Sequence, residues 1–113
     1  MDYSKTGNAE ELETILVNGR VIDPLSSIDE ITQIGIMGGR ITAVGKKLSP
    51  GSKTRVLDCK GLYVVPGLID LHVHAFCSEH QRLGLQPDFI MNKSGVTTML
   101  DAGGAGSRNW LMM

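Results

Sequence analysis

The segment LYVVPGLIDLHVH, residues 62–74, joins an apolar, β-branched run to two histidines at its end. In an extended strand, side chains two positions apart point to the same side. We therefore expect His72 and His74 to present their imidazoles side by side, roughly 6–7 Å apart at the backbone for a rise of about 3.3 Å per residue. A buried strand has little use for two adjacent basic rings unless something charged lies between them.

The histidine pair indicates a metal site with His72 and His74 as ligands, because neutral imidazole suits Zn²⁺. The alternative is two structural histidines with satisfied hydrogen bonds. Two ligands do not complete a site, since catalytic zinc usually takes three protein ligands and a water. Cys77 and His80 follow closely, so a self-contained four-ligand zinc site is a second hypothesis. The simpler interpretation makes Cys77 an apolar filler and His80 a loop residue.

The second half of the chain has the pattern of a βαβ unit. Residues 68–74 are more uniformly apolar than the preceding strands, as expected of a parallel strand covered on both faces, and residues 96–101 are predicted to form a second buried strand. Between them, residues 87–94 are predicted to form a helix, with proline first and Gly95 at its end. Because chemistry sits at the carboxyl ends of parallel strands, the histidine pair and Asp101 are expected to open onto one face.

Two aspartates near the pair allow more than one role. Asp70 shares the face of His72 and could orient a ligand, but a structural hydrogen bond is the favoured interpretation. Asp101 could face the site or cap a turn. The glycine-rich residues 103–106 lack the full dinucleotide or Walker pattern, so they indicate phosphate binding only weakly. No serine, cysteine and histidine arrangement signals a nucleophilic triad, and no organic cofactor site is assigned.

Residues 14–58 read as a small antiparallel β module of hairpins. Asn18-Gly19 lies between two β-rich runs and predicts a type I′ hairpin. Residues 25–30 are expected to form a loop. A second hairpin is predicted for residues 33–37 and 40–44 around Gly38-Gly39, and residues 55–58 form a further strand. These strands are too few and too short to close on themselves, which leaves open edges.

The composition excludes several classes of protein. The 113 residues suffice for one domain, and the shares of hydrophobic (42%) and charged (20%) residues are ordinary for globular chains. A net charge of −1 with scattered basic residues indicates neither nucleic acid nor membrane as a partner. The first residues have no signal-peptide pattern, and Cys59 and Cys77 make no disulfide framework. A cytoplasmic location is therefore expected.

Four stretches resemble the start of the amidohydrolase superfamily: residues 15–24, residues 39–45, residues 65–74 with the specific pattern Pro-Gly-x-x-Asp-x-His-x-His, and residues 95–103. The similarity is strongest to the dihydroorotase-like amidohydrolases and deacetylases that act on N-acyl compounds. It implies an α/β fold, namely a (β/α)₈ TIM barrel preceded by part of a β-sandwich. The implied divisions are a flexible N-terminus at 1–13, a β-sandwich portion at 14–64 and the first βαβ unit of the barrel at 65–113.

The resemblance also implies the chemistry. His72 and His74 would bind the more buried metal of a centre with one or two zinc ions. Metal-activated water would then hydrolyse an amide-type C–N bond in a small-molecule substrate, an N-acyl compound or a cyclic amide. In the family, a carboxylated lysine, two more histidines and a catalytic aspartate come from later barrel strands, so the general base is expected beyond residue 113. A homo-oligomer is compatible with the full-length form.

The sequence departs from the family in two respects. A barrel of this type needs about 250 residues, so the 113 residues are expected to be an N-terminal fragment, inactive alone. Dihydroorotases usually carry an arginine two residues after the second histidine, whereas this chain has Phe76. Two rival hypotheses follow: a non-catalytic homologue kept as a scaffold for assembly, and a small structural zinc module that uses Cys77 and His80.

Overall fold

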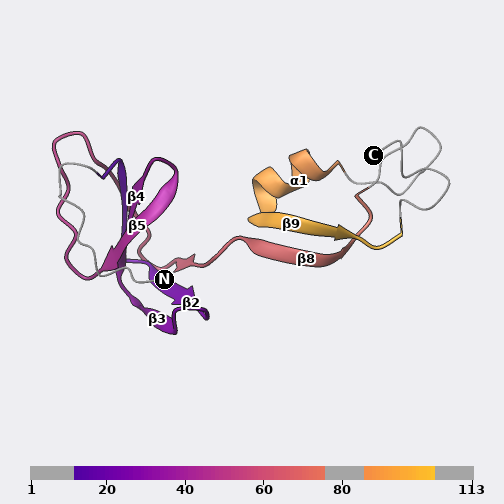
Figure 1. Ribbon diagram of the computed structural model, residues 1–113, viewed down its shortest axis with the longest axis horizontal. Helices are drawn as coiled ribbons and strands as arrows, with labels where there is room; N and C mark the ends of the chain where they lie inside the picture. The colour runs from indigo at the N-terminus through magenta and orange to yellow at the C-terminus, as the bar shows by residue number, and fades with distance from the viewer. Residues whose placement is uncertain (1–11, 76–85, 104–113) are drawn as a thin grey trace. The chain divides into compact units, whose positions relative to one another are not determined.

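The computed structural model describes residues 12–75 and 86–103. The chain divides into two compact units, residues 1–66 and 67–113, and Figure 1 labels most of their elements. The first unit is an all-β module and the second is a βαβ unit. Residues 1–11, most of the segment predicted to be a flexible N-terminus, lie outside the described residues.

The N-terminal module contains two sheets (Figure 1). In the four-stranded sheet, β1 lies between β4 and β6, and β5 follows β4; in the three-stranded sheet, β2 lies between β3 and β7. β1 and β2 each pair antiparallel with one neighbour and parallel with the other, so the prediction of a wholly antiparallel module is wrong. The strands are β1 (Thr14–Val17), β2 (Arg20–Asp23), β3 (Ile28–Ile31), β4 (Gln33–Met37), β5 (Arg40–Gly45), β6 (Arg55–Asp58) and β7 (Tyr63–Val64).

The hairpin predicted at Asn18-Gly19 is wrong, because β1 and β2 belong to different sheets. A type I′ turn needs positive φ at both central residues, and only Asn18, at φ 64°, has it. The Asn18 amide donates to the Asp58 carboxylate at 2.9 Å. A Cβ on Gly19 would lie 2.7 Å from the Val64 side chain. The pair is thus a tightly packed crossing from one sheet to the other.

The loop predicted at residues 25–30 is also partly wrong, since residues 28–31 form β3 and pair with β2. The connecting turn places Ser27 at φ 54°, and the Asp23 carboxylate accepts a hydrogen bond from the Leu25 amide at 3.1 Å. The Gly38-Gly39 hairpin is confirmed: both glycines have positive φ, and β4 pairs antiparallel with β5. Residues 55–58 form the predicted strand β6.

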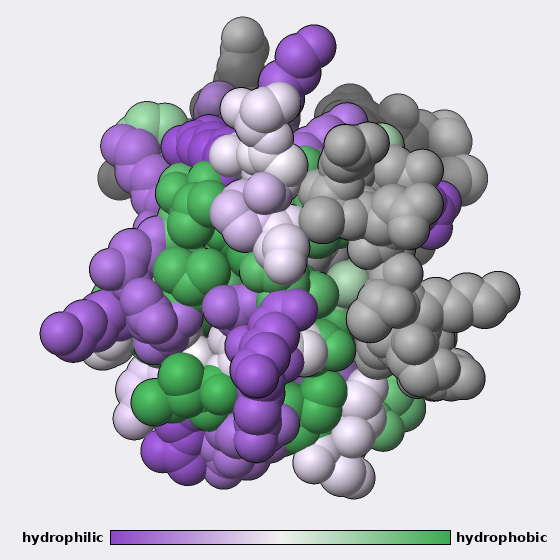
Figure 2. All heavy atoms as spheres, turned by 90° about the vertical axis from the view of Figure 1, so that its left-hand side faces the viewer, coloured by the Kyte–Doolittle hydropathy of each residue, from purple (hydrophilic) through white to green (hydrophobic). Residues whose placement is uncertain are grey.

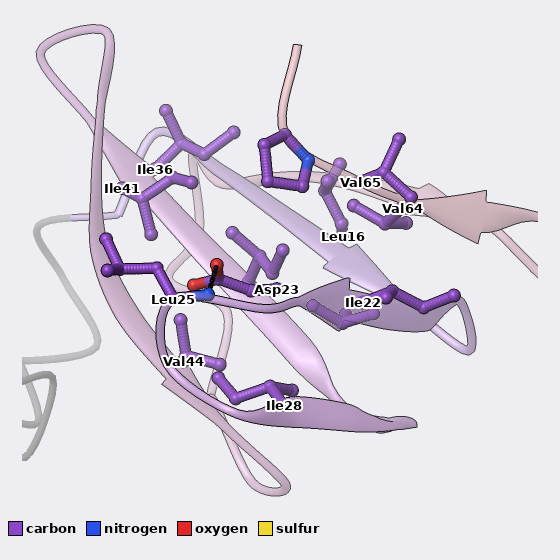
Figure 3. Close-up of a pocket in the computed structure, with 13 residues that line it drawn as sticks. Leu16, Ile22, Asp23, Leu25, Ile28, Ile36, Ile41, Val44, Val64 and Val65 are labelled. Atoms are coloured by element: carbon purple, nitrogen blue, oxygen red, sulfur yellow. Dashed lines mark hydrogen bonds between the residues drawn. The ribbon is translucent and has the colours of Figure 1, made fainter. Parts of the chain in front are cut away.

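Aliphatic side chains fill the space inside this module. Ile15 is the most deeply buried, with 1% of its surface exposed. Beside this core lies a cavity of about 420 Å³, lined by side chains of both sheets such as Leu16, Ile22 and Val44 (Figure 3). Hydrophobic side chains also reach the surface between charged ones (Figure 2), among them Leu25 and Ile41. The module therefore carries more apolar surface than its own strands cover.

An ion pair joins two strands of the three-stranded sheet. Arg20 on β2 donates to both carboxylate oxygens of Asp29 on β3, at 2.6 and 2.8 Å. The Arg20 guanidinium also lies 5.8 Å from the centre of the Tyr63 ring on β7. The hydrogen bond from Arg20 holds the pKa of Asp29 below its usual value. Both ends of the ion pair are about half exposed, so solvent screens their attraction.

This ion pair predicts a pH dependence of stability. Because the folded-state pKa of Asp29 is lowered, the stabilisation is present above the unfolded-state pKa of about 4 and is lost as the pH falls through the folded value. The stability difference between wild type and Asp29→Asn should therefore shrink steadily below pH 4, and urea unfolding between pH 2 and 7 measures it. Arg20→Gln is the matched variant and should behave alike. A difference that stays constant across this range would contradict the prediction.

The second unit consists of β8 (Leu68–Val73), helix α1 (Pro87–Ser94) and β9 (Val96–Asp101). The two strands pair in parallel, from Leu68 opposite Val96 to Val73 opposite Asp101. Gly95 ends the helix in the left-handed conformation, at φ 72°. The predicted strand–helix–strand unit is confirmed, except that β8 ends one residue before His74.

The expected burial of these strands on both faces is not found. Ile69 and Leu71 on β8 are 62% and 70% exposed, and Leu100 on β9 is 58% exposed. Helix α1 buries none of its own residues, so in the described part of the chain it covers little of the sheet. The α/β fold class, a β-sandwich portion followed by a βαβ unit, is confirmed. In the described ranges no helix is long and apolar enough to span a membrane.

Candidate functional site

The candidate site lies at the carboxyl end of β8. His72 is the last residue but one of the strand, and His74 follows the strand directly. Their ring centroids are 5.6 Å apart and their planes are nearly perpendicular, at 83°. Val73 between them is buried, at 6% exposure, whereas both histidines are exposed. The strand thus anchors Val73 in the unit and presents both imidazoles together.

Asp70 holds the backbone of the first histidine. Its Oδ1 accepts a hydrogen bond from the His72 amide at 3.0 Å, and the residue is half-buried. This contact fixes the main chain at the amide nitrogen of His72, next to the Cα atom that carries the imidazole. Of the two roles considered for Asp70, the contact supports the structural one.

Asp101, at the end of β9, joins the two segments that leave the parallel strands. One carboxylate oxygen accepts from the Ala75 amide at 3.0 Å, and the other accepts from the Gly103 amide at 2.9 Å. The Ala102 amide donates to the Val73 carbonyl at 2.8 Å. Asp101 thus serves as the turn cap that the sequence allowed, and it does so directly beside His74.

Gly103 is a member of the site that the sequence did not single out for this role. Its φ is 145°, and a Cβ placed on it would lie 3.8 Å from Cε1 of His74. The glycine therefore forms the wall next to the second imidazole. The available signal is a glycine run directly after a strand, a pattern that indicates phosphate binding only weakly. Of residues 103–106, only Gly103 is among the described residues.

The histidine pair fits part of a zinc site. Two exposed imidazoles 5.6 Å apart can turn their nitrogens towards one ion, and neutral imidazole is a preferred zinc ligand. Across residues 12–75 and 86–103, no group of three or more histidine, cysteine, aspartate or glutamate side chains could hold a metal ion. Cys77 and His80, the further ligands of the self-contained site, and Phe76 lie outside these ranges.

The cavity in the N-terminal module offers no comparable chemistry. Its lining is aliphatic apart from Asp23 and Pro66. The Asp23 carboxylate is engaged by the Leu25 amide (Figure 3). A hydrogen bond from Ser26 holds the pKa of Asp23 below its usual value, so this carboxylate is a poor candidate for a general base at neutral pH. The functional argument therefore concerns the histidine pair.

Comparison with known proteins gives partial matches to a group of hydrolases. No protein-family model matches the chain. It is 44% identical over 63 residues to a dihydroorotase of Geotalea daltonii, covering 56% of this chain and 15% of that protein. It is 39% identical over 72 residues to a deacetylase of Agrobacterium fabrum, covering 64% of this chain and 17% of that protein.

A solved structure shares the fold of the described residues. It is the N-acyl-D-glutamate deacylase of Bordetella bronchiseptica, crystallised with zinc and a phosphonate inhibitor. The TM-score is 0.58 and the identity 28%, over 80% of this chain and 18% of that one. The chain thus spans less than a fifth of the length of each of these proteins.

Proposed function

Because this chain belongs to the amidohydrolase superfamily, we propose that it supplies the first two metal ligands of a zinc-dependent hydrolase. The enzyme would cleave an amide-type C–N bond in a small molecule. The observation that carries the proposal is the pair of exposed imidazoles, 5.6 Å apart, at the carboxyl end of a parallel strand. The two proteins with matching sequence are named dihydroorotase and deacetylase, and the matching structure is a deacylase complexed with zinc.

Each residue of the site has a defined task in this proposal. His72 and His74 hold the zinc ion through neutral ring nitrogens. A bound zinc supplies Lewis acidity, which activates water and polarises a carbonyl group. Asp70 fixes the backbone of His72 through the amide hydrogen bond of 3.0 Å. The exposure of both rings leaves their outer side open to further ligands and to the substrate.

The fold supports the same assignment. The unit β8–α1–β9 is the start of a (β/α)₈ barrel in this proposal, and the N-terminal module is part of the accompanying β-sandwich. The exposed faces of β8 and β9 and the apolar surface of the module are then covered by later parts of such a fold. The remaining zinc ligands and the general base also come from outside these 113 residues. Phe76 occupies the position where dihydroorotases usually carry arginine, which argues against dihydroorotate as the substrate.

The proposal predicts zinc binding without turnover for the 113-residue chain. Equilibrium dialysis against zinc chloride should show binding that depends on the two histidines. Assays with N-acetyl amino acids, hydantoin and dihydroorotate should show no hydrolysis above the buffer rate, because two ligands do not complete a catalytic centre. Zinc-dependent hydrolysis by this chain alone would contradict the incomplete site. A chain that holds no zinc would instead contradict the metal role of the pair.

A further inference from the structure

We infer that Asp101 is a positioning residue for His74, which it holds in place through two backbone amides. The inference rests on the proposed metal role of His74. Asp101 is 27 positions away from His74 in the chain and comes from the other strand of the parallel pair. Its carboxylate reaches the main chain of the segment that carries His74, through the hydrogen bond from the Ala75 amide described above.

The residues directly before and after His74 are both hydrogen-bonded to the end of β9. The residue before it, Val73, accepts from the Ala102 amide at 2.8 Å. The residue after it, Ala75, donates to Asp101 Oδ2 at 3.0 Å. Both bonds lead to the end of β9. Because His74 lies just past the last residue of β8, strand pairing alone does not fix its backbone, and the Asp101 bond extends the attachment to Ala75, two residues past the strand.

The second carboxylate oxygen of Asp101 binds Gly103, the residue that lies beside the His74 imidazole. Oδ1 accepts from the Gly103 amide at 2.9 Å, which holds Gly103 at the φ of 145° that brings it next to His74. One side chain therefore fixes both the main chain after His74 and the backbone against which its ring lies. Hydrogen bonds to an ionised carboxylate are shorter and stronger than neutral ones, which suits a residue that must hold two loops together.

The two aspartates of the site divide this work between the two histidines. Asp70 holds the His72 amide from within the same strand, over two residues. Asp101 holds the segment after His74 from the neighbouring strand. Asparagine at 101 preserves the shape but has a single acceptor oxygen, so it can keep one of the two bonds and must turn an NH₂ group towards the other amide. Alanine loses both bonds.

The test is a zinc titration of the 113-residue chain, wild type and Asp101→Asn, followed through the imidazole signals of His72 and His74 by NMR. Partners that hydrogen-bond a metal ligand directly typically contribute 10–100-fold in affinity. Asp101 acts through the backbone, so Asp101→Asn should weaken zinc binding by about 10-fold, the lower end of that range. Amide hydrogen exchange without metal supplies an independent readout, because Ala75 and Gly103 should exchange faster in the variant. Asp88→Asn, the same substitution on exposed α1, is the matched control and should match wild type in both.

The outcomes separate the two hypotheses. If wild type binds zinc through its histidines and Asp101→Asn binds it equally well, the positioning role is overturned while the proposed function stands. If wild type shows no histidine-dependent zinc binding, the proposed function fails first. Asp101→Ala should lose more zinc affinity than Asp101→Asn. If the alanine variant no longer forms the β8–β9 pair, the result for Asp101→Asn is the one that tests the inference. A general loss of stability with unchanged exchange at Ala75 and Gly103 would also overturn the inference.

Discussion

Replacement of both His72 and His74 by asparagine is expected to abolish zinc binding by the chain. The rings lie 5.6 Å apart, and the described residues contain no group of three metal-binding side chains that could take their place. Asparagine keeps a polar side chain at two exposed positions, so the βαβ unit should remain folded. Equilibrium dialysis with zinc measures the loss, and circular dichroism checks the fold. Each single variant should retain weak binding, because one imidazole remains.

The controls for this prediction are Cys77→Ser and His80→Ala. If the pair is the start of a larger site, both variants should bind zinc as wild type does. If either variant loses zinc as completely as the double histidine variant does, the self-contained four-ligand site is supported instead. The comparison therefore separates the superfamily assignment from the structural zinc module.

The largest effect on stability is expected for Ile15→Ala, in the central strand β1 of the four-stranded sheet. Ile15 is 1% exposed, between β4 and β6. Removing a buried isoleucine down to alanine typically costs about 2–5 kcal/mol, since it loses apolar burial and leaves a cavity. Such a loss is a large fraction of the roughly 5–15 kcal/mol that stabilises an ordinary domain. Urea unfolding followed by far-ultraviolet circular dichroism measures it.

Ile31→Ala is the matched control for Ile15. It removes the same atoms from a strand of the same module, but Ile31 is 68% exposed. Its cost should lie within about 0.5 kcal/mol of zero, as is usual for surface positions. Ile15→Val should lie between the two, at about 0.5–1.5 kcal/mol. Equal losses for Ile15→Ala and Ile31→Ala would mean that β1 is not the packing centre of the module.

Local sequence signals predict those elements correctly whose structure depends on residues close together in the chain. Gly38-Gly39 supplies two positive φ values, so the β4–β5 hairpin follows from the turn itself. The helix at residues 87–94 follows from Pro87 at its start and Gly95 at its end. The two segments predicted as buried strands around this helix form the parallel pair β8 and β9. The βαβ unit is therefore specified by local signals in the sequence.

Asn18-Gly19 shows where local signals fail. The dipeptide is the usual mark of a tight hairpin, but β1 finds its partners in β4 and β6, more than 15 residues further along the chain. The hydrogen bond from Asn18 to Asp58 and the lack of space at Gly19 belong to that crossing. Residues 28–31 were missed for a similar reason, since polar Asp29 and Glu30 form a strand because β2 offers them an edge.

For the candidate site, the two-residue spacing of His72 and His74 was enough to place both rings together, because strand side chains repeat every second residue. Their role as metal ligands stays a prediction. What holds them required the tertiary structure. Asp101 reaches Ala75 across 26 positions only because the parallel register sets Val73 opposite Asp101. The chemical character of the site is thus local in the sequence, whereas its rigidity comes from strand pairing, which brings distant residues into hydrogen-bond range.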